Sequence, residues 1–335
     1  MVQKEQEVLL EMLALAKGSV GKRLDLLYFL SKHPWLHLQP DQVADAIGFL
    51  GPLRGVSDQQ DALLNLVEAR LRCFAQEGCR VAVFSMPKSG STYLSDLMTK
   101  VLGVPRVNLD TCAESNTNAG CNAREDELDE FALVQSTLVY GSWVAQHHTK
   151  ASASLMYLLR NYQVYPIVMV RNILDCIVSM DDMMMEWNSA ESEAVSRGHI
   201  FFNTGGRLPY NFTSLDAPER YRILLEAWGR WYLEFYVSWK RAKLSKFCSP
   251  LITRYEEHVA NPEALSSLLV ESLGLDSGQV GRLDQSVGQR VRFNKGVVGR
   301  GAIIPVEQRE FLRALASGFG EELAAEELHY LVDVQ

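Results

Sequence analysis

A strand, a Ser/Gly turn and a helix follow one another within residues 80–101, and this succession constrains the fold more than any other feature of the chain. Residues 81–86 form a run that is apolar except for Ser85, contains β-branched side chains and ends at Pro87. Such a run predicts a buried strand, and proline ends its hydrogen-bond ladder because it has no N–H to donate. Apolar residues then recur at helical spacing at positions 94, 97, 98 and 101. The turn therefore leads into a helix start, where unpaired backbone N–H groups favour an anion.

The turn carries its own cation and its own hydroxyl groups. Lys88 supplies a positive charge, and Ser89, Ser91 and Thr92 supply hydroxyl donors around Gly90. Together with the helix-start amides, these groups predict a pocket for a phosphate. The order differs from the common nucleotide loop G-x-x-x-x-G-K-[ST], because here the lysine precedes the glycine. The alternative interpretation is an ordinary serine-capped helix with a lysine nearby.

Apolar runs and amphipathic segments alternate along most of the chain. The runs that predict further strands are 104–109, 142–150, 165–170 and 251–255. The segments that predict helices include 124–138, 151–161, 173–185, 217–244 and the second part of 256–273, and two short helices close the chain. This alternation predicts an α/β fold with a central, mostly parallel β-sheet flanked by helices.

Polar groups follow three of the predicted strands. They are the Lys88 turn, the adjacent pair His147 and His148, and Arg171 after the run 165–170. In open parallel sheets ligands bind beyond the carboxyl ends of the strands. We therefore expect these groups to converge on one site.

Two domains are expected from the pattern. Residues 1–77 predict an N-terminal helical extension packed on the core, and residues 78–335 predict the main domain. Residues 186–216 and 287–304 show no periodicity. Because long structureless stretches in compact domains are usually lids or disordered, we predict an active-site lid over 186–216.

Composition bears on partners and compartment. The net charge of −8 argues against a nucleic-acid partner, although a local basic site can still bind an anion. Six scattered cysteines without a C-x-x-C pair are typical of a reduced, cytoplasmic protein and give no reason to expect a metal site. Charged residues interrupt the N-terminal segment, so we expect neither a signal peptide nor a membrane anchor.

Four stretches, in order, resemble the sulfotransferases that use 3′-phosphoadenosine 5′-phosphosulfate (PAPS). They are residues 87–94, 146–148, 170–179 and 293–299. With the segments between them, the resemblance covers residues 81–310 and leaves the N-terminal helices outside. It implies a P-loop-like sulfotransferase fold, PAPS as co-substrate and no required metal.

The resemblance also implies roles for individual residues. Lys88 would contact the sulfate and the bridging oxygen. The turn residues would bind the 5′-phosphate: they are Ser89, Gly90, Ser91, Thr92 and Tyr93. Arg171 and Ser179 would bind the 3′-phosphate. Arg171 ends the predicted strand, and Ser179, eight residues later, lies about two helical turns on and faces the same side. A helix-capping salt bridge between Arg171 and Asp175 is the alternative.

The fourth stretch resembles a loop that grips the 3′-phosphate and covers the adenine. Its residues here are Asn294, Lys295 and Gly296, and Asn294 stands where the family has an arginine. Lys295 and Arg292 are the candidates to replace the missing cation. A solvated basic loop is the alternative interpretation.

Sulfuryl transfer needs a base for the acceptor proton and a cation for the leaving oxygen. Adjacent residues on an extended chain point to opposite faces, so only one of His147 and His148 can act as the base. We choose His148 from its position relative to Arg171. The family often has a lysine at the position of Gln146, so we expect Lys88 to carry most of the charge stabilisation unless Lys150 turns inward.

The acceptor is not readable from the sequence. Apolar residues in and before the predicted lid suggest an adaptable surface: Met183, Met184, Met185, Trp187, Phe201, Phe202 and Tyr210. A small hydroxylated molecule is the first expectation, and a hydroxyacyl chain on a carrier protein is the second. The oligomeric state stays open. The rival functions are a P-loop nucleotide kinase or hydrolase and a non-catalytic nucleotide-binding protein.

Overall fold

The computed structural model describes residues 2–34, 36–109, 128–190, 198, 200, 204–245, 248–286 and 297–334. The chain divides into two compact units. The first comprises Met1–Arg80, Asp129–Trp143 and Ser152–Tyr165, and the second comprises Val81–Leu128, Val144–Ala151 and Pro166–Gln335. Whether residues 1–77 form a domain of their own stays a prediction.

Strands and helices alternate between residues 80 and 254, after a run of helices at the start of the chain and before another run of helices toward its end. The strands are β1 (Arg80–Ser85), β2 (Arg106–Val107), β3 (Trp143–His147), β4 (Val164–Val170) and β5 (Leu251–Arg254). The helices up to β4 are α1 (Val2–Ala16), α2 (Val20–Lys32), α3 (Pro40–Leu50), η1 (Gly51–Leu53), α4 (Asp58–Ala75), α5 (Ser91–Leu102), α6 (Glu130–Tyr140) and α7 (Ala153–Asn161). The helices after β4 are α8 (Ile173–Ala190), η3 (Phe212–Ser214), α10 (Ala217–Leu244), α11 (Tyr255–Ala260), α12 (Pro262–Leu273), α13 (Ser277–Ser286), η4 (Arg300–Ile303), α14 (Val306–Ser317) and α15 (Ala325–Val332).

The strands form one parallel sheet in the order β2-β3-β1-β4-β5. In the register, Arg106 lies opposite Val144, and Ile167 lies opposite Leu251. Every residue of β1 is buried, as expected for a strand covered on both faces. The predicted α/β fold with a parallel sheet is therefore confirmed.

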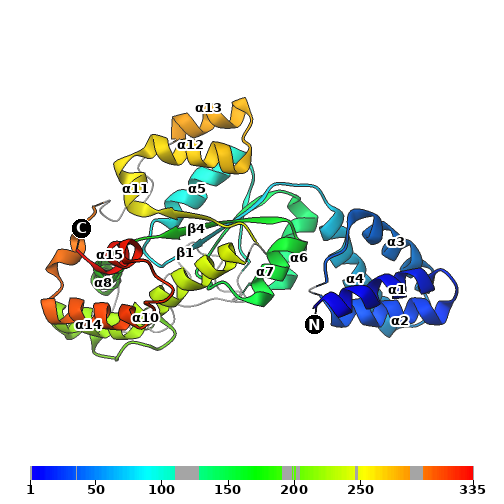
Figure 1. Cartoon of the computed structure of the whole chain (residues 1–335), viewed down its shortest axis with the longest axis horizontal. Helices are drawn as coiled ribbons and strands as arrows, with labels where there is room; N and C mark the ends of the chain where they lie inside the picture. The colour runs from blue at the N-terminus through cyan, green and yellow to red at the C-terminus, as the bar shows by residue number, and fades with distance from the viewer. Residues whose placement is uncertain are drawn as a thin grey trace. The chain divides into compact units, whose positions relative to one another are not determined.

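The chain changes direction across the sheet between β1 and β4. These strands are neighbours, yet the chain leaves β1 toward β2 at one edge and leaves β4 toward β5 at the other. Figure 1 shows α5 and α12 on one side of these strands and α8 and α10 on the other. The crevice at such a switch point, beyond the carboxyl ends of the strands, is where ligands bind in open α/β sheets.

Helix α10 supplies much of the core of the second unit. Its aromatic residues are buried: Trp228, Trp231, Tyr232, Phe235 and Trp239. Phe84 of β1 lies against Trp239, with ring centroids 4.6 Å apart. Helix α10 also packs against α8 and α14. The aromatic stripe of α10 is thus a packing face of the core.

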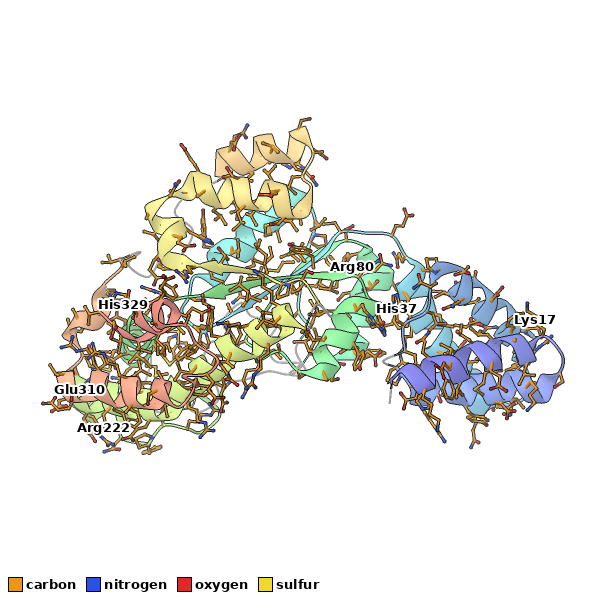
Figure 2. All side chains as sticks on the ribbon, in the orientation of Figure 1. Lys17, His37, Arg80, Arg222, Glu310 and His329 are labelled. Atoms are coloured by element: carbon orange, nitrogen blue, oxygen red, sulfur yellow. The ribbon has the colours of Figure 1, made fainter. Side chains whose placement is uncertain are left out.

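The buried guanidinium of Arg80 connects three backbone segments of the first unit. Arg80, labelled in Figure 2, donates to the backbone carbonyl oxygens of Gly141 at 2.8 Å, Tyr162 at 2.8 Å and Gln76 at 2.5 Å. The helices α1 to α4 pack on one another, and α4 also packs on α6.

Within the described residues, no helix combines the length and the apolarity needed to cross a membrane.

Several element boundaries were predicted wrongly. The helix expected over 124–138 begins at Glu130, because the Asp129 side chain caps it by accepting from the Phe131 N–H at 2.8 Å; residues 124–127 lie outside the described part. The strand expected over 104–109 is reduced to β2. The helix expected over 151–161 begins at Ala153, after the cap Ser152.

The stretch 186–216 is not structureless throughout. Helix α8 continues to Ala190, and η3 lies further on. The helix continues past Met185 because no glycine or proline follows until Gly198. Similarly, η4 lies within the expected irregular stretch 287–304. A lid role for residues 186–216 stays a prediction.

Candidate nucleotide and transfer site

The turn after β1 is held tightly against β4. The Met86 N–H donates to the Met169 carbonyl at 3.2 Å. The Ser89 hydroxyl donates to the carbonyls of Met86 at 2.6 Å and Met169 at 3.3 Å. Tyr232 of α10 donates its hydroxyl to the Pro87 carbonyl at 3.0 Å. The buried Ser89 side chain thus stabilises the turn through two backbone carbonyls. That Ser89 also binds a phosphate is still only a prediction.

Helix α5 begins immediately after this turn, with Gly90 as its N-cap at φ 89°. As a glycine, this N-cap residue has no side chain that could accept from the N–H groups of the first turn. The predicted ligands Ser91, Thr92 and Tyr93 are the first three residues of the helix, so their N–H groups lie at its positive end. This geometry suits an anion.

Gly90 is also required sterically. A Cβ at this position would come within 2.7 and 2.8 Å of ring carbons of Tyr255. The Tyr255 ring lies 4.3 Å from the guanidinium carbon of Arg171. One aromatic ring therefore packs against both the turn and the cation at the end of β4.

Lys88 occupies a strained and partly buried position in the turn. Its φ is 69°, in the left-handed region that non-glycine residues rarely adopt. Its Nζ lies 3.3 Å from the Sδ of Met183 on α8. Burial, and then the neighbouring charge of Arg171, lowers the pKa of Lys88 to about 8. Backbone strain and a shifted pKa at one residue are typical of functional sites.

Arg171 joins the ends of β4 and β1. Its Nη1 donates to the Lys88 carbonyl at 3.0 Å, and its Nη2 donates to the Val297 carbonyl at 3.0 Å. Nη2 also lies 3.4 Å from the Asp175 carboxylate, so the salt bridge of the alternative interpretation is present. A guanidinium has five N–H groups, and these contacts do not use all of them. Phosphate binding by Arg171 stays a prediction.

Asn172, next in the chain, ties this strand end to the C-terminal helix. Its side-chain amide donates to the carbonyls of Tyr330 and Asp333, both at 2.8 Å, and its N–H donates to the Glu256 carboxylate at 3.0 Å. The Tyr330 hydroxyl donates to the same carboxylate. Burial raises the pKa of Glu256. The backbone beneath Arg171 is thus fixed on several sides.

Ser179, the second predicted 3′-phosphate ligand, lies on α8 and is buried. The remaining predicted residues of this site, Asn294, Lys295 and Gly296, lie outside the described residues, as does Arg292. The end of the fourth stretch is described. It lies against α8, since the Gly299 N–H donates to Asp175 at 2.9 Å. The third and fourth stretches are therefore brought together.

The two histidines at the end of β3 have different surroundings. His148 Nδ1 lies 2.8 Å from the carbonyl oxygen of Ser85 and 3.2 Å from its hydroxyl. The His147 ring instead lies beside Phe84, with centroids 6.1 Å apart. His148 thus contacts Ser85, the last residue of β1 before the Lys88 turn, and His147 lies among the aromatic rings of β1 and α10.

Gln146 and Lys150 do not supply a second cation at the site. Gln146 donates to the Ser91 hydroxyl at 2.8 Å and accepts from Arg106 at 2.5 Å. Lys150 pairs with Glu234 of α10 at 3.0 Å. Gln146 therefore buttresses the start of α5 from the neighbouring strand.

Sequence reasoning missed several supports of the site. Tyr255 was expected only as the end of a strand, and no pattern linked Ser85 to His148. Met183 was noted, but its contact with Lys88 was not foreseen. The sequence offered one signal for these contacts: the carboxyl ends of parallel strands lie at the same edge of the sheet, so residues at those ends are expected to be neighbours.

No protein-family model and no curated protein match the chain. Among solved structures, the fold of this chain is similar to the crystal structure of mouse sulfotransferase SULT7A1 complexed with PAP (adenosine 3′,5′-bisphosphate). The two are 16% identical, the match covers 78% of this chain and 90% of that chain, and the TM-score is 0.47. This neighbour is a sulfotransferase, the family that the four sequence stretches resemble.

Proposed function

We propose that this chain is a PAPS-dependent sulfotransferase, which moves a sulfuryl group from PAPS to an acceptor hydroxyl by in-line displacement. One observation carries the proposal: the hydrogen bond from Arg171 to the Lys88 carbonyl sets two cations beside the start of α5, whose N-cap is Gly90. This pairing lies at the switch point of the sheet, where a phosphate-bearing ligand is expected.

The described residues fit a nucleotide with two phosphate positions. The 5′ end would lie on the first-turn amides of α5, beside Lys88. The 3′-phosphate would lie near Arg171, just before α8, and Ser179, two turns into that helix. Arginine suits the second position because its planar fork offers paired donors to a phosphate.

His148 is the proposed general base. A proton on Nδ1, donated to the Ser85 carbonyl, makes Nε2 the accepting nitrogen of the neutral ring. In the reaction the acceptor oxygen would form a bond to sulfur and give its proton to Nε2. The bond from sulfur to the bridging oxygen would break, and Lys88 would stabilise the charge on the phosphate that leaves.

Met183 supports an acceptor with apolar character, because its thioether lies against the Lys88 ammonium where transfer would occur. We propose a small hydroxylated molecule or a carrier-bound hydroxyacyl chain as acceptor, and a cytoplasmic setting.

Calorimetry with adenosine 3′,5′-bisphosphate (PAP) and with ATP–Mg²⁺ tests the nucleotide assignment. Tighter binding of PAP is expected, and tighter binding of ATP–Mg²⁺ would favour a kinase or hydrolase. A screen with radiolabelled PAPS then tests transfer, using phenols, alkyl alcohols, sugars and carrier-bound hydroxyacids. Binding of PAP without transfer to any acceptor would favour a non-catalytic nucleotide-binding protein.

A further inference from the structure

Asp175, on the first turn of α8, is a buried carboxylate that faces a distant part of the chain. Its side chain is 2% exposed. Oδ2 accepts from the N–H of Gly299 at 2.9 Å, and Oδ1 accepts from the N–H of Gly301 at 2.7 Å. Both oxygens are therefore engaged by the backbone of one short segment, residues 297–301.

The same carboxylate also contacts the cation of the proposed nucleotide site. Arg171 Nη2 lies 3.4 Å from Asp175 Oδ2 and donates to the Val297 carbonyl at 3.0 Å. Arg171 Nη1 continues the network to the Lys88 carbonyl at 3.0 Å. One connected set of charge-assisted hydrogen bonds thus runs from segment 297–301 to the phosphate turn.

The packing of this segment leaves little freedom. A Cβ at position 301 would come within 2.4 Å of the Leu174 Cβ, so the backbone approaches α8 as closely as glycine allows. Gly299 adopts φ 82°, which favours glycine. Arg300, between these two glycines, forms an ion pair with Asp182, which lies about two turns after Asp175 on α8. The segment is built to present its amides to Asp175.

We propose that Asp175 is a positioning residue of the nucleotide site, which holds Arg171 and residues 297–301 in the arrangement that receives the second phosphate. This inference rests on the proposed function. Asp175 itself touches no reacting atom in this account. It acts through Arg171, whose guanidinium it helps to hold beside the Lys88 carbonyl.

A simpler role for Asp175 is stabilisation of α8 alone, since an acidic residue in a first turn complements the helix dipole. The two roles differ in what they predict for ligands. Helix stabilisation changes the free energy of unfolding and affects all nucleotides equally. Positioning of Arg171 affects the ligand with a second phosphate more than the ligand without it.

The test compares Asp175→Asn with Asp181→Asn. Asp181 is a matched control because it lies on the same helix, is 4% exposed and forms a two-pronged ion pair with Arg220 at 2.6 and 2.9 Å. Calorimetry measures the affinities of PAP and of adenosine 5′-monophosphate, and their ratio is the readout. Hydrogen exchange reports the protection of the Gly299 and Gly301 amides.

Asparagine keeps only one accepting oxygen, so in Asp175→Asn we expect at least one of the two amides to lose protection. The ratio of PAP to monophosphate affinity should fall about tenfold or more, the effect of one charge-assisted contact. Asp181→Asn should leave the ratio unchanged. An unchanged ratio in Asp175→Asn, or an equal fall in Asp181→Asn, would overturn the positioning role alone. Failure of the unmodified chain to bind PAP would overturn the proposed function and the positioning role with it.

Discussion

The Arg171 guanidinium donates a hydrogen bond of 3.0 Å to the backbone carbonyl of Lys88, and so ties the end of β4 to the end of β1. Two like charges are thereby kept close, and the charge of Arg171 helps to lower the pKa of Lys88. Like charges repel by Coulomb's law, and the Asp175 carboxylate, 3.4 Å from Arg171, offsets only part of this repulsion, since the pKa of Lys88 is still lowered. The arrangement is therefore one that an anionic ligand would stabilise.

Lys88→Ala is expected to lower sulfuryl transfer about 10²–10³-fold, the loss typical of removing one group that stabilises transition-state charge. Steady-state turnover with PAPS and the acceptor found by screening measures the effect. Lys100→Ala is the matched control, because Lys100 is exposed in the last turn of α5, the helix that follows the Lys88 turn. Nearly intact turnover in Lys88→Ala would refute the role of Lys88.

Binding of PAP at pH 8 should be accompanied by proton uptake. With a pKa of about 8, Lys88 is roughly half protonated at this pH. An anion beside it favours the charged form and raises the pKa, so about half a proton is taken up. The phosphates bring no proton, since their second pKa is about 6.

Calorimetry in buffers of different ionisation enthalpy measures this uptake directly. Lys88→Arg is the control, because arginine stays charged throughout and should abolish the uptake. Uptake of the same size in Lys88→Arg would show that another group is responsible.

His148→Asn should lower turnover by about 10²–10⁴, the contribution typical of general base catalysis, with little change in PAP affinity. The amide of asparagine can still donate to the Ser85 carbonyl, which His148 Nδ1 approaches at 2.8 Å, but no base remains at the position of Nε2. His147→Asn, measured beside it, decides between the two histidines. If only the His147 variant loses turnover at unchanged affinity, the assignment must be reversed.

Gly90→Ala should destabilise the fold more than Gly103→Ala and should weaken PAP binding. Both glycines have positive φ and flank α5, so both substitutions carry the backbone cost of about 1 kcal/mol or more. Only at Gly90 does the new Cβ also meet the Tyr255 ring, at 2.7 Å, whereas nothing lies within 4 Å at Gly103. Urea unfolding measures the difference, and equal losses would show that the ring moves aside.

The stability of the second unit should fall as the pH drops from 6.5 to 4, in part because of His258. This residue is buried beside Thr253, and burial lowers its pKa from 6.5 to about 4. The unfolded chain then binds a proton at pH values where the folded chain does not, so the free energy of unfolding decreases as pH falls. The shift corresponds to an effect on the order of 3 kcal/mol.

Urea unfolding of the unmodified chain and of His258→Gln at several pH values isolates this contribution, because the other titrating groups are common to both. The difference in unfolding free energy between the two chains should change across pH 4–6.5 and stay constant above it. A difference that is independent of pH would contradict the prediction.

The sequence predicted the strands and the groups at their ends because both are local signals. A continuous apolar run identifies β4, and Arg171 follows it directly. The order of the strands could not be predicted, since it depends on contacts between residues far apart in the chain. For the same reason, the support of Gly90 by Tyr255 and the capture of the Gly301 amide by Asp175 emerged only in three dimensions. The helix α8 was predicted to end at Met185, because the residues that follow are largely polar, which is typical of a loop. None of them is a residue that ends a helix, and α8 continues to Ala190.

A crystal structure of the chain with PAP tests the central claim most directly. The account predicts the 5′-phosphate on the first-turn amides of α5 beside Lys88, and the 3′-phosphate within hydrogen-bond distance of Arg171 and Ser179. A nucleotide bound elsewhere on the molecule, or reversed so that its 3′-phosphate lies at α5, would contradict it.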